Sequence, residues 1–578
     1  MIRARTFPSG GALRRLPFGV LDVGVFAFTL VILFVILKVG RGAAVSFHPS
    51  ETMRISTDPS HLPYYLARSL LRMFVALFFS TVFTLGYGYA AARSRRLEKI
   101  LVPALDILQS VPVLGFLSVT VTAFIALFPG SLLGLECASV FAIFTSQAWN
   151  MTFSFYYSVR ALPRELDELS RVLRLTRWQR YWKIEVPNGI VGLVWNGMMS
   201  FGGGWFFLAA SEAITVFNHN YTLPGIGSYV AEATERQQMG YVGIAIGAMI
   251  VTVIVVNVLF WRPLTAWSER YKLETSSAVL QQRSLVLELL HKTNWSNWTA
   301  AACVKVTQPL GRAMRILGRD GTSALEPVTD ARQRRGDALF ALAVGVPIAY
   351  GLYRAVAYIG QDGYGDVASV FGLGALTLLR VVILVVVSTV VWIPVGVWIG
   401  FNPRVATLAQ PVVQILASFP ANFLFPFAAL LFIKTGLTLN IGGILLMSLG
   451  AQWYILFNVI AGAMAIPTDL REAADTLGLR GWQRWRRLIL PGIFPAYVTG
   501  GITAAGGAWN ASIVAEIVTY GHTTLTASGL GAYITKATQD GNFHHILAGI
   551  AVMSIYVVAF NRLFWHRLYR IAETRYAL

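Results

Sequence analysis

The chain has 578 residues, of which 55% are apolar and only 13% are charged, and its mean hydropathy is +0.59. Because a soluble globular domain carries about 25% charged residues, this composition excludes soluble enzyme folds and predicts an integral protein of the lipid bilayer. The net charge of +19 comes largely from arginines beside the ends of apolar segments. That is the pattern of cytoplasmic loops, so the charge indicates topology and no nucleic-acid partner.

The chain opens with a basic stretch followed by an apolar segment of about twenty residues, longer than the roughly 7–15 apolar residues of a signal peptide. We therefore expect a retained first span with a cytoplasmic start. The apolar runs are long and free of charge, which predicts helices rather than barrel strands. Hydropathy predicts twelve spans, at 18–39, 69–91, 112–128, 132–158, 188–214, 239–261, 338–358, 372–400, 412–434, 438–462, 492–514 and 543–565.

The loops alternate in charge. Starting inside, every strongly basic loop falls on the cytoplasmic side, including the long polar segment 266–336, and both termini are expected in the cytoplasm. The sequence therefore predicts a multi-pass protein of the bacterial cytoplasmic (inner) membrane.

An internal repeat sets the architecture. Residues 161–187 align without a gap with residues 465–491, at an offset of 304, and ten of the 27 positions are identical. Upstream of this block the offset is 308. Because each half holds an even number of spans, the copies are expected to run parallel. The predicted units are an N-terminal tail with the first span (1–59), a first repeat (60–275), a cytoplasmic linker (276–336), an additional span (337–367) and a second repeat (368–578).

The most similar part of the two copies is a cytoplasmic loop. In the second copy, Pro467 and Asp469 favour the start of a helix, and Gly478 favours its end. A short basic helix, 482–490, follows. The sequence predicts a compact helix–turn–helix that is too apolar for free solvent, which indicates a docking surface for a partner.

These residues resemble a known family. The loop of the second copy is similar to the EAA loop of binding-protein-dependent ABC importer permeases. It has the run Glu472-Ala473-Ala474, then Gly478, and then an apolar-x-Leu-Pro sequence that ends at Pro491. The first copy departs from the pattern, with Glu168 followed by Leu-Ser and with Arg174 where glycine is expected. Segments 411–427 and 505–533 resemble the nitrate/sulfonate/taurine type. The chain thus looks like a duplicated, fused permease component, which implies the type I ABC importer fold with about 12 transmembrane helices in two parallel six-helix repeats.

The resemblance implies partners and a role. Two copies of an ABC ATPase subunit would dock on residues of the two loops, and an extracytoplasmic substrate-binding protein would deliver a small anion such as nitrate, sulfonate, taurine or bicarbonate. The expected ATPase-docking residues are Glu168, Arg174, Glu472, Ala473, Ala474 and Gly478. No Gly-x-x-x-x-Gly-Lys-Ser/Thr phosphate loop occurs, so ATP and Mg belong on the partner. We expect a transport permease, not an enzyme, with no catalytic, cofactor or metal site on this chain.

Matched ionisable and aromatic residues near the outer ends of the spans are candidates for the translocation path. The candidates are Arg72, Arg380, Trp205, Trp509, Glu212 and Glu516. Paired arginines could attract an anion, although such residues also extend toward the membrane interface. The glutamates could form a gate or be solvated at the span ends, and Glu136 is interpreted as a polar residue of the interface. The glycines before each tryptophan favour close helix packing.

Two alternatives remain at this stage. One is a fused permease for ferric ion or thiamine, and the other is a secondary transporter with twelve helices. The sequence leaves open the substrate, the residues that line the path, the role of the linker and whether the two ATPase copies are identical.

Overall fold

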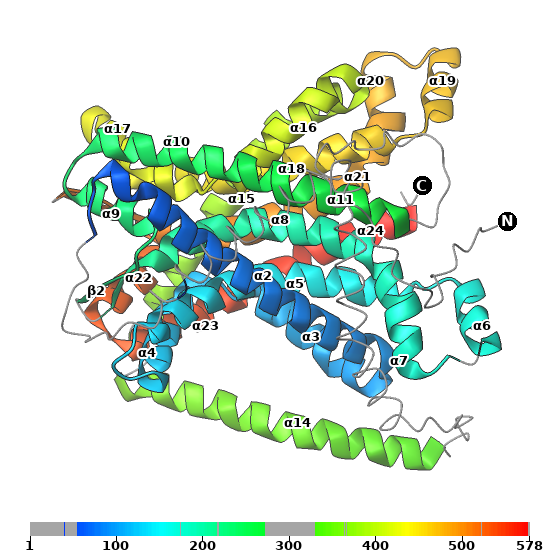
Figure 1. Cartoon of the computed structure of the whole chain (residues 1–578), viewed down its shortest axis with the longest axis horizontal. Coiled ribbons are helices and arrows are strands. Elements are labelled where there is room, and N and C mark those ends of the chain that lie inside the picture. The colour runs from blue at the N-terminus through cyan, green and yellow to red at the C-terminus, as the bar shows by residue number, and fades with distance from the viewer. Residues whose placement is uncertain are drawn as a thin grey trace, which may run out of the picture.

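The computed structural model describes residues 55–173, 175–216, 219–271, 330–362, 367–521 and 523–575, together with Gly40 and Gly365. These residues form a bundle of long helices with two short β-hairpins (Figure 1). The prediction of an all-α polytopic membrane protein with two repeats is confirmed, whereas the hairpins were not predicted. The first predicted span, 18–39, and most of the linker lie outside the described residues.

Apart from η2 and η6, which occur only in the first, the two repeats carry the same elements in the same order. The first consists of η2 (Pro59–His61), α2 (Leu62–Arg93), α3 (Arg95–Ser110), η3 (Val113–Phe116), α4 (Leu117–Leu127), α5 (Leu133–Arg160), α6 (Arg164–Val172), α7 (Arg177–Arg180), η4 (Tyr181–Glu185), α8 (Val186–Glu212), β1 (Ala213–Val216), β2 (His219–Thr222), α9 (Ile226–Glu235), α10 (Met239–Val256), η5 (Asn257–Trp261), α11 (Arg262–Ser268) and η6 (Glu269–Tyr271). The second consists of α15 (Val367–Phe401), α16 (Pro403–Ser418), η8 (Ala421–Leu424), α17 (Phe425–Thr435), α18 (Leu439–Ala465), α19 (Thr468–Thr476), α20 (Gly481–Arg484), η9 (Trp485–Ile489), α21 (Leu490–Ala515), β3 (Ile517–Tyr520), β4 (Thr523–Thr526), α22 (Leu530–Asp540), α23 (Phe543–Phe560), η10 (Asn561–Trp565) and α24 (His566–Arg575).

Two expected spans, 112–128 and 412–434, fall on sharply bent helix pairs: 112–128 is the second limb of one pair, and 412–434 runs across the bend of the other. The chain bends by 85° between Arg95–Gln109 and Val113–Leu127, and by 79° between Pro403–Ser418 and Ala421–Thr435. Pro112 and Pro420 stand at the bends, and the residue before a proline avoids the helical conformation. Helices α4 and α17 have 11 residues each. At 1.5 Å per residue this length is about half of the roughly 30 Å hydrocarbon core.

Length and apolar composition identify fewer than twelve spans in the described part of the chain. Six helices there are long and apolar enough to cross a membrane, or eight if each bent pair is one span. Helices α5, α8 and α14 (Asp330–Ile359) have 28, 27 and 30 residues. They are long enough to span but are not among those six. The count of twelve and the domain boundaries stay predictions.

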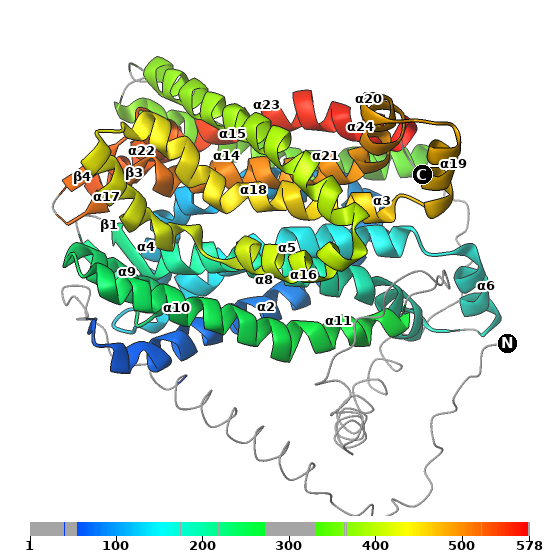
Figure 2. The same ribbon diagram turned by 90° about the horizontal axis from the view of Figure 1, so that it is seen from above.

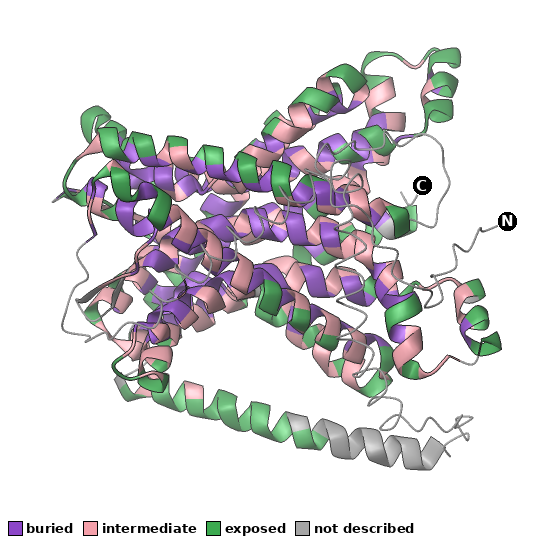
Figure 3. Cartoon of the chain, viewed as in Figure 1, coloured by how far each residue is buried: buried purple, intermediate pink, exposed green. Residues whose placement is uncertain are grey.

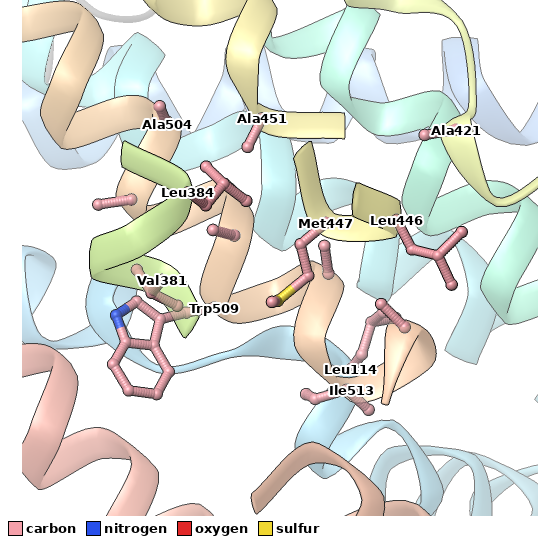
Figure 4. Close-up of a cluster of buried hydrophobic side chains, with 14 of the residues drawn as sticks. Leu114, Val381, Leu384, Ala421, Leu446, Met447, Ala451, Ala504, Trp509 and Ile513 are labelled. Atoms are coloured by element: carbon pink, nitrogen blue, oxygen red, sulfur yellow. The ribbon is translucent and has the colours of Figure 1, made fainter. Parts of the chain in front are cut away.

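The bends of the two helix pairs, η3 and η8, pack into the opposite repeat. In Figure 4, Leu114 of η3 lies beside Ile513 of α21, within the apolar core of the second repeat. In the opposite direction, Phe423 of η8 is buried in the core of the first repeat. Each repeat thus completes the other's core, which fixes the two halves side by side.

Helix α14 lies along the edge of the bundle. It is exposed over most of its described length (Figure 3). Near its end, the ring of Tyr358 stacks on His544 of α23, with ring centroids 4.1 Å apart. This helix corresponds to the predicted additional span, although it begins at Asp330, before the expected boundary at 337.

The two ends of the bundle differ. The helix–turn–helix units around α6 and around α19 lie at one end, and the two β-hairpins lie at the other (Figures 1 and 2). We call these the knob end and the hairpin end. The first knob is α6, α7 and η4, and the second knob is α19, α20 and η9. Strand β1 pairs with β2, and β3 with β4, both antiparallel.

Candidate functional site

The second knob has the predicted local structure. Pro467 precedes α19 with an extended backbone, and Asp469 lies in the first turn. The helix ends at Gly478, whose φ of +66° lies in the left-handed region that favours glycine. The Leu479 N–H donates to the carbonyl of Ala474 at 2.9 Å and closes the turn.

The first knob repeats this plan with other residues. Pro163 has the same backbone angles as Pro467, with φ of −55° and ψ of 141°. The Leu175 N–H donates to the carbonyl of Ser170 at 3.0 Å, the same closure as in the second knob. Arg174, which stands where Gly478 stands, lies outside the described residues.

The knobs present apolar side chains to solvent. Val172 is 79% exposed, Leu477 is 75% exposed and Trp482 is 71% exposed. Of the expected docking residues, Glu168, Glu472, Ala473 and Gly478 are exposed. Ala474 is buried, so it cannot itself form the outer contact surface. Apolar side chains exposed at the tip of a loop are typical of a contact surface for a partner.

The matched arginine and glutamate of the first repeat form a buried ion pair toward the hairpin end. The Arg72 guanidinium donates to Glu212 at 2.6 Å, and both side chains are almost fully buried. Glu212 also accepts from the Ser69 hydroxyl at 2.5 Å and from the Gly227 N–H at 2.7 Å. The ion pair thus joins α2, the end of α8 and the start of α9.

The second repeat builds the same ion pair. The Arg380 guanidinium donates to Glu516 at 2.7 Å. Glu516 accepts from the Thr377 hydroxyl and from the Gly531 N–H, both at 2.8 Å. We call these two groups of contacts the carboxylate clamps. Their members occupy equivalent positions in the two repeats, so the clamp is a property of the repeat.

A glycine makes room for each clamp. A Cβ atom on Gly225 would collide with the carboxylate of Glu212, and one on Gly529 would collide with that of Glu516. Both glycines have extended backbones with φ near ±180°, so the need is for space and not for an unusual conformation. This explains why the repeat keeps glycine at both positions.

The clamps differ in one pair of residues. In the first repeat, Glu136 accepts from Arg72 at 2.5 and 2.7 Å and also pairs with Arg68. The equivalent residues of the second repeat are Asn440 and Leu376. There the Asn440 side chain accepts from Arg380 at 2.9 Å. One cation and one anion are lost together, so charge is balanced in both halves. Glu136 is thus buried in the clamp and is not an exposed interface residue.

The other path candidates are core residues. Trp205 is 2% exposed and Trp509 is 1% exposed, each within the apolar core of its own repeat. In this conformation, all four charged path candidates lie within the clamps.

A small, partly open cavity lies between the repeats. It is lined by Gly202, Gly203, Phe206, Phe207, Ala417, Phe419, Ala421, Gly450, Tyr454, Gly507, Asn510 and Ala511. None of the six path candidates lines it, whereas Trp205 lines a second, smaller space next to Gln414 and Ser418. The glycines that were predicted to serve helix packing are therefore also the walls of the main cavity.

Two polar side chains give the main cavity its chemistry. Asn510 accepts from the Val113 N–H at 2.9 Å and so links α21 to the bend of the other repeat. Tyr454 of α18 reaches across to α8 of the first repeat. Its hydroxyl lies so close to Gly203 that a Cβ atom at that position would be only 2.9 Å away. Neither residue was predicted as a site residue, because only the crossed packing of the two repeats brings them together.

Comparison with known proteins gives a family for this arrangement. The family model for the binding-protein-dependent transport system inner membrane component matches twice, at residues 82–262 and 392–577. Each match covers one knob, one clamp glutamate and one side of the cavity.

Individual relatives match about one repeat. The chain is 26% identical over 204 residues to the taurine transport system permease protein of Escherichia coli, which is 35% of this chain and 70% of that protein. It is 25% identical over 201 residues (35% and 68%) to the nitrate import permease protein of Leptolyngbya laminosa. It is 27% identical over 164 residues (28% and 56%) to the bicarbonate transport system permease protein of Synechococcus elongatus. In each comparison the matched segment makes up about twice as large a fraction of the relative as of this chain. Each relative is therefore about half as long as this chain.

Proposed function

Because the chain belongs to the family of binding-protein-dependent transport system inner membrane components, we propose that it is both halves of an importer's permease and moves a small anion inward. The observation that carries this proposal is the double match of the family model to one chain whose halves together line a cavity. A single-copy relative supplies one such half, whereas this chain supplies two.

The substrate class rests on the relatives. Those described above are named for taurine, nitrate and bicarbonate, small molecules that each carry an anionic group. None of these three is named for ferric ion or thiamine, so the alternatives have no support from them. The first test is the ligand of the binding protein encoded beside this chain, measured by calorimetry against a panel of oxyanions, sulfonates, ferric ion and thiamine. We expect an anion to bind, and a binding protein that holds ferric ion or thiamine would contradict the substrate class.

We propose that the anion passes between the repeats through the main cavity. The cavity is lined by residues of both halves and contains neutral polar groups, Tyr454 and Asn510. The buried arginines Arg72 and Arg380 are held by carboxylates in the clamps. We therefore assign the clamps to holding the hairpin end together and not to contact with the anion.

The energy source is proposed to lie on a partner. The exposed apolar tips of both knobs are surfaces suited to docking, and the chain has no phosphate-binding loop. ATP and Mg would then bind to two ABC ATPase subunits, one beneath each knob. Glu168, Arg174, Glu472, Ala473 and Gly478 are the proposed contact residues, and Ala474 supports them from behind.

The orientation follows from the position of the basic residues. Arg93, Arg95 and Arg96 lie at the same end as the knobs, as do the arginines of both knobs. Basic residues favour the cytoplasmic side. We propose that the knob end and both termini are cytoplasmic and that the hairpin end faces the binding protein.

The copy number of the ATPase can be measured directly. We expect the purified complex to contain one permease chain and two ATPase subunits, as determined by native mass spectrometry. Leu173→Asp and Leu477→Asp alter one exposed tip each, so each variant should yield a complex with a single ATPase subunit. A wild-type complex with one ATPase subunit, or with none, would contradict the proposal that both knobs dock.

A further inference from the structure

A chain of ionic contacts links the first knob to the end of helix α2. The Arg93 guanidinium, at the last residue of α2, donates to Oε1 of Glu185 in η4. The same oxygen accepts from Nε of Arg180 at 2.8 Å. Arg180 in turn pairs with Asp167 of α6. The contacts therefore run from a long span, through η4 and α7, to the helix proposed to dock the ATPase.

The centre of this chain is buried. The Glu185 side chain is 1% exposed, whereas those of Arg93, Arg180 and Asp167 are between 22% and 35% exposed. Burial alone would raise the pKa of Asp167, but the charges of Arg180 and Arg171 lower it below its ordinary value. Asp167 is therefore ionised at neutral pH and available to Arg180.

The second knob makes the corresponding link without a carboxylate. The residues equivalent to Arg93, Glu185 and Asp167 are Phe401, Ile489 and Arg471. The Arg471 guanidinium lies over the Phe401 ring, 4.4 Å from its centroid. Arg471 also donates to the carbonyl of Ala463, in the last turn of α18, at 2.6 Å.

The arginine shared by both knobs has a different partner in each. Arg180 bridges two carboxylates and so connects α6 to the body. Its equivalent, Arg484, pairs at 2.7 Å with Asp475, which belongs to α19 itself. The ionic chain of the second knob therefore stays within the knob, and the cation–π contact alone joins its docking helix to the end of α15.

We propose that Arg93, Glu185, Arg180 and Asp167 are positioning residues that transmit the movement of the first docking helix to α2, whereas the second repeat transmits it through the cation–π contact of Arg471 with Phe401. The inference rests on the proposed function, because it assumes that an ATPase moves the knobs. Partly exposed ion pairs are screened by salt, so the first link is sensitive to ionic strength and the second is less so.

The test uses the full permease–ATPase complex in lipid vesicles and compares uptake with ATP hydrolysis. Glu185→Gln keeps the size and one acceptor oxygen but removes the charge that holds two guanidinium groups together. We expect the number of anions transported per ATP to fall by about fivefold or more, the size of a typical coupling between sites. Asp167→Asn, at the partly exposed end of the chain, is the second variant and should act in the same direction.

Asp475→Asn is the matched control, because it removes an ion pair of the second knob that does not reach the body. It should leave the transport ratio unchanged. The quadruple variant Arg93→Phe/Asp167→Arg/Arg171→Asp/Glu185→Ile gives the first knob the linking residues of the second, including the equivalent of Asp475 as a partner for Arg180. It should recover a ratio near that of the wild type and lose the dependence on salt.

Complex stoichiometry and thermal stability are measured for every variant, so a loss of folding is seen separately. A wild-type ratio in Glu185→Gln and Asp167→Asn, with complexes intact, would overturn the inference. An equal loss in Asp475→Asn would also overturn it, because the effect would then not follow the link to α2. If the wild-type chain binds no ATPase, the proposed importer function is wrong. That outcome differs from failure of the ionic link, in which the complex forms but the variants keep the wild-type transport ratio.

Discussion

Glu516→Ala is expected to destabilise the second repeat by about 3–5 kcal/mol, the usual cost of leaving one charge of a buried pair without its partner. Arg380 would remain buried, and the hydroxyl of Thr377 and the Gly531 N–H would lose their acceptor. The measurement is the melting temperature and the yield of monodisperse protein in detergent. We expect the same loss for Glu212→Ala, because the first clamp has the same plan.

The two repeats provide a matched control for this prediction. Glu136→Asn alone leaves Arg68 and Arg72 with less negative charge and should be destabilising. Arg68→Leu/Glu136→Asn copies the residues of the second repeat and should be closer in stability to the wild type. A double variant as unstable as Glu136→Asn would show that charge balance does not govern the clamp.

Gly478→Val is expected to weaken binding of the ATPase by about 5- to 100-fold. A β-branched residue at a φ of +66° is strained by about 1–3 kcal/mol, and 1.4 kcal/mol corresponds to a factor of ten in affinity. The strain would displace the turn that presents Leu477 beside it. Binding is measured by pull-down of the ATPase and uptake by labelled anion.

Arg174→Ala is the comparison in the first knob. That knob already lacks glycine at this position, so we expect a milder loss of ATPase binding and of uptake. The second knob is then the tighter of the two contacts. Equal losses in the two variants, or a larger loss for Arg174→Ala, would contradict this asymmetry.

The local features of the knobs could be predicted from sequence because they depend on neighbouring residues. Pro467 and Gly478 determine the start and the end of α19 through their own backbone preferences. The repeat was visible for a similar reason, since an offset of 304 preserves short motifs. These features required no knowledge of tertiary contacts.

The bent pairs and the hairpins were not predicted because hydropathy measures how apolar a segment is and not the direction in which the chain runs. Residues 112–128 are apolar enough to suggest a span, yet they begin at a bend at Pro112, and the first of them, in η3, pack into the core of the other repeat. The hairpins occupy short segments directly after Glu212 and Glu516, where an outer loop was expected.

The clamps could be predicted only in part. Arg72 and Glu212 were recognised as matched residues, but they are 140 positions apart, and sequence does not show that they meet. Glu136 was interpreted as a surface residue for the same reason. One signal of the contact is present in the sequence. Arg68 and Glu136 are both replaced by neutral residues in the second repeat, and the joint loss of one positive and one negative charge indicates that the two residues pair.

The most direct test of the central claim is uptake by vesicles that contain the permease, with the ATPase on the knob side and the binding protein on the hairpin side. We predict accumulation of a labelled anion only when the binding protein, the ATPase and ATP are all present. Uptake that proceeds without ATPase and ATP, driven by an ion gradient, would contradict the importer function.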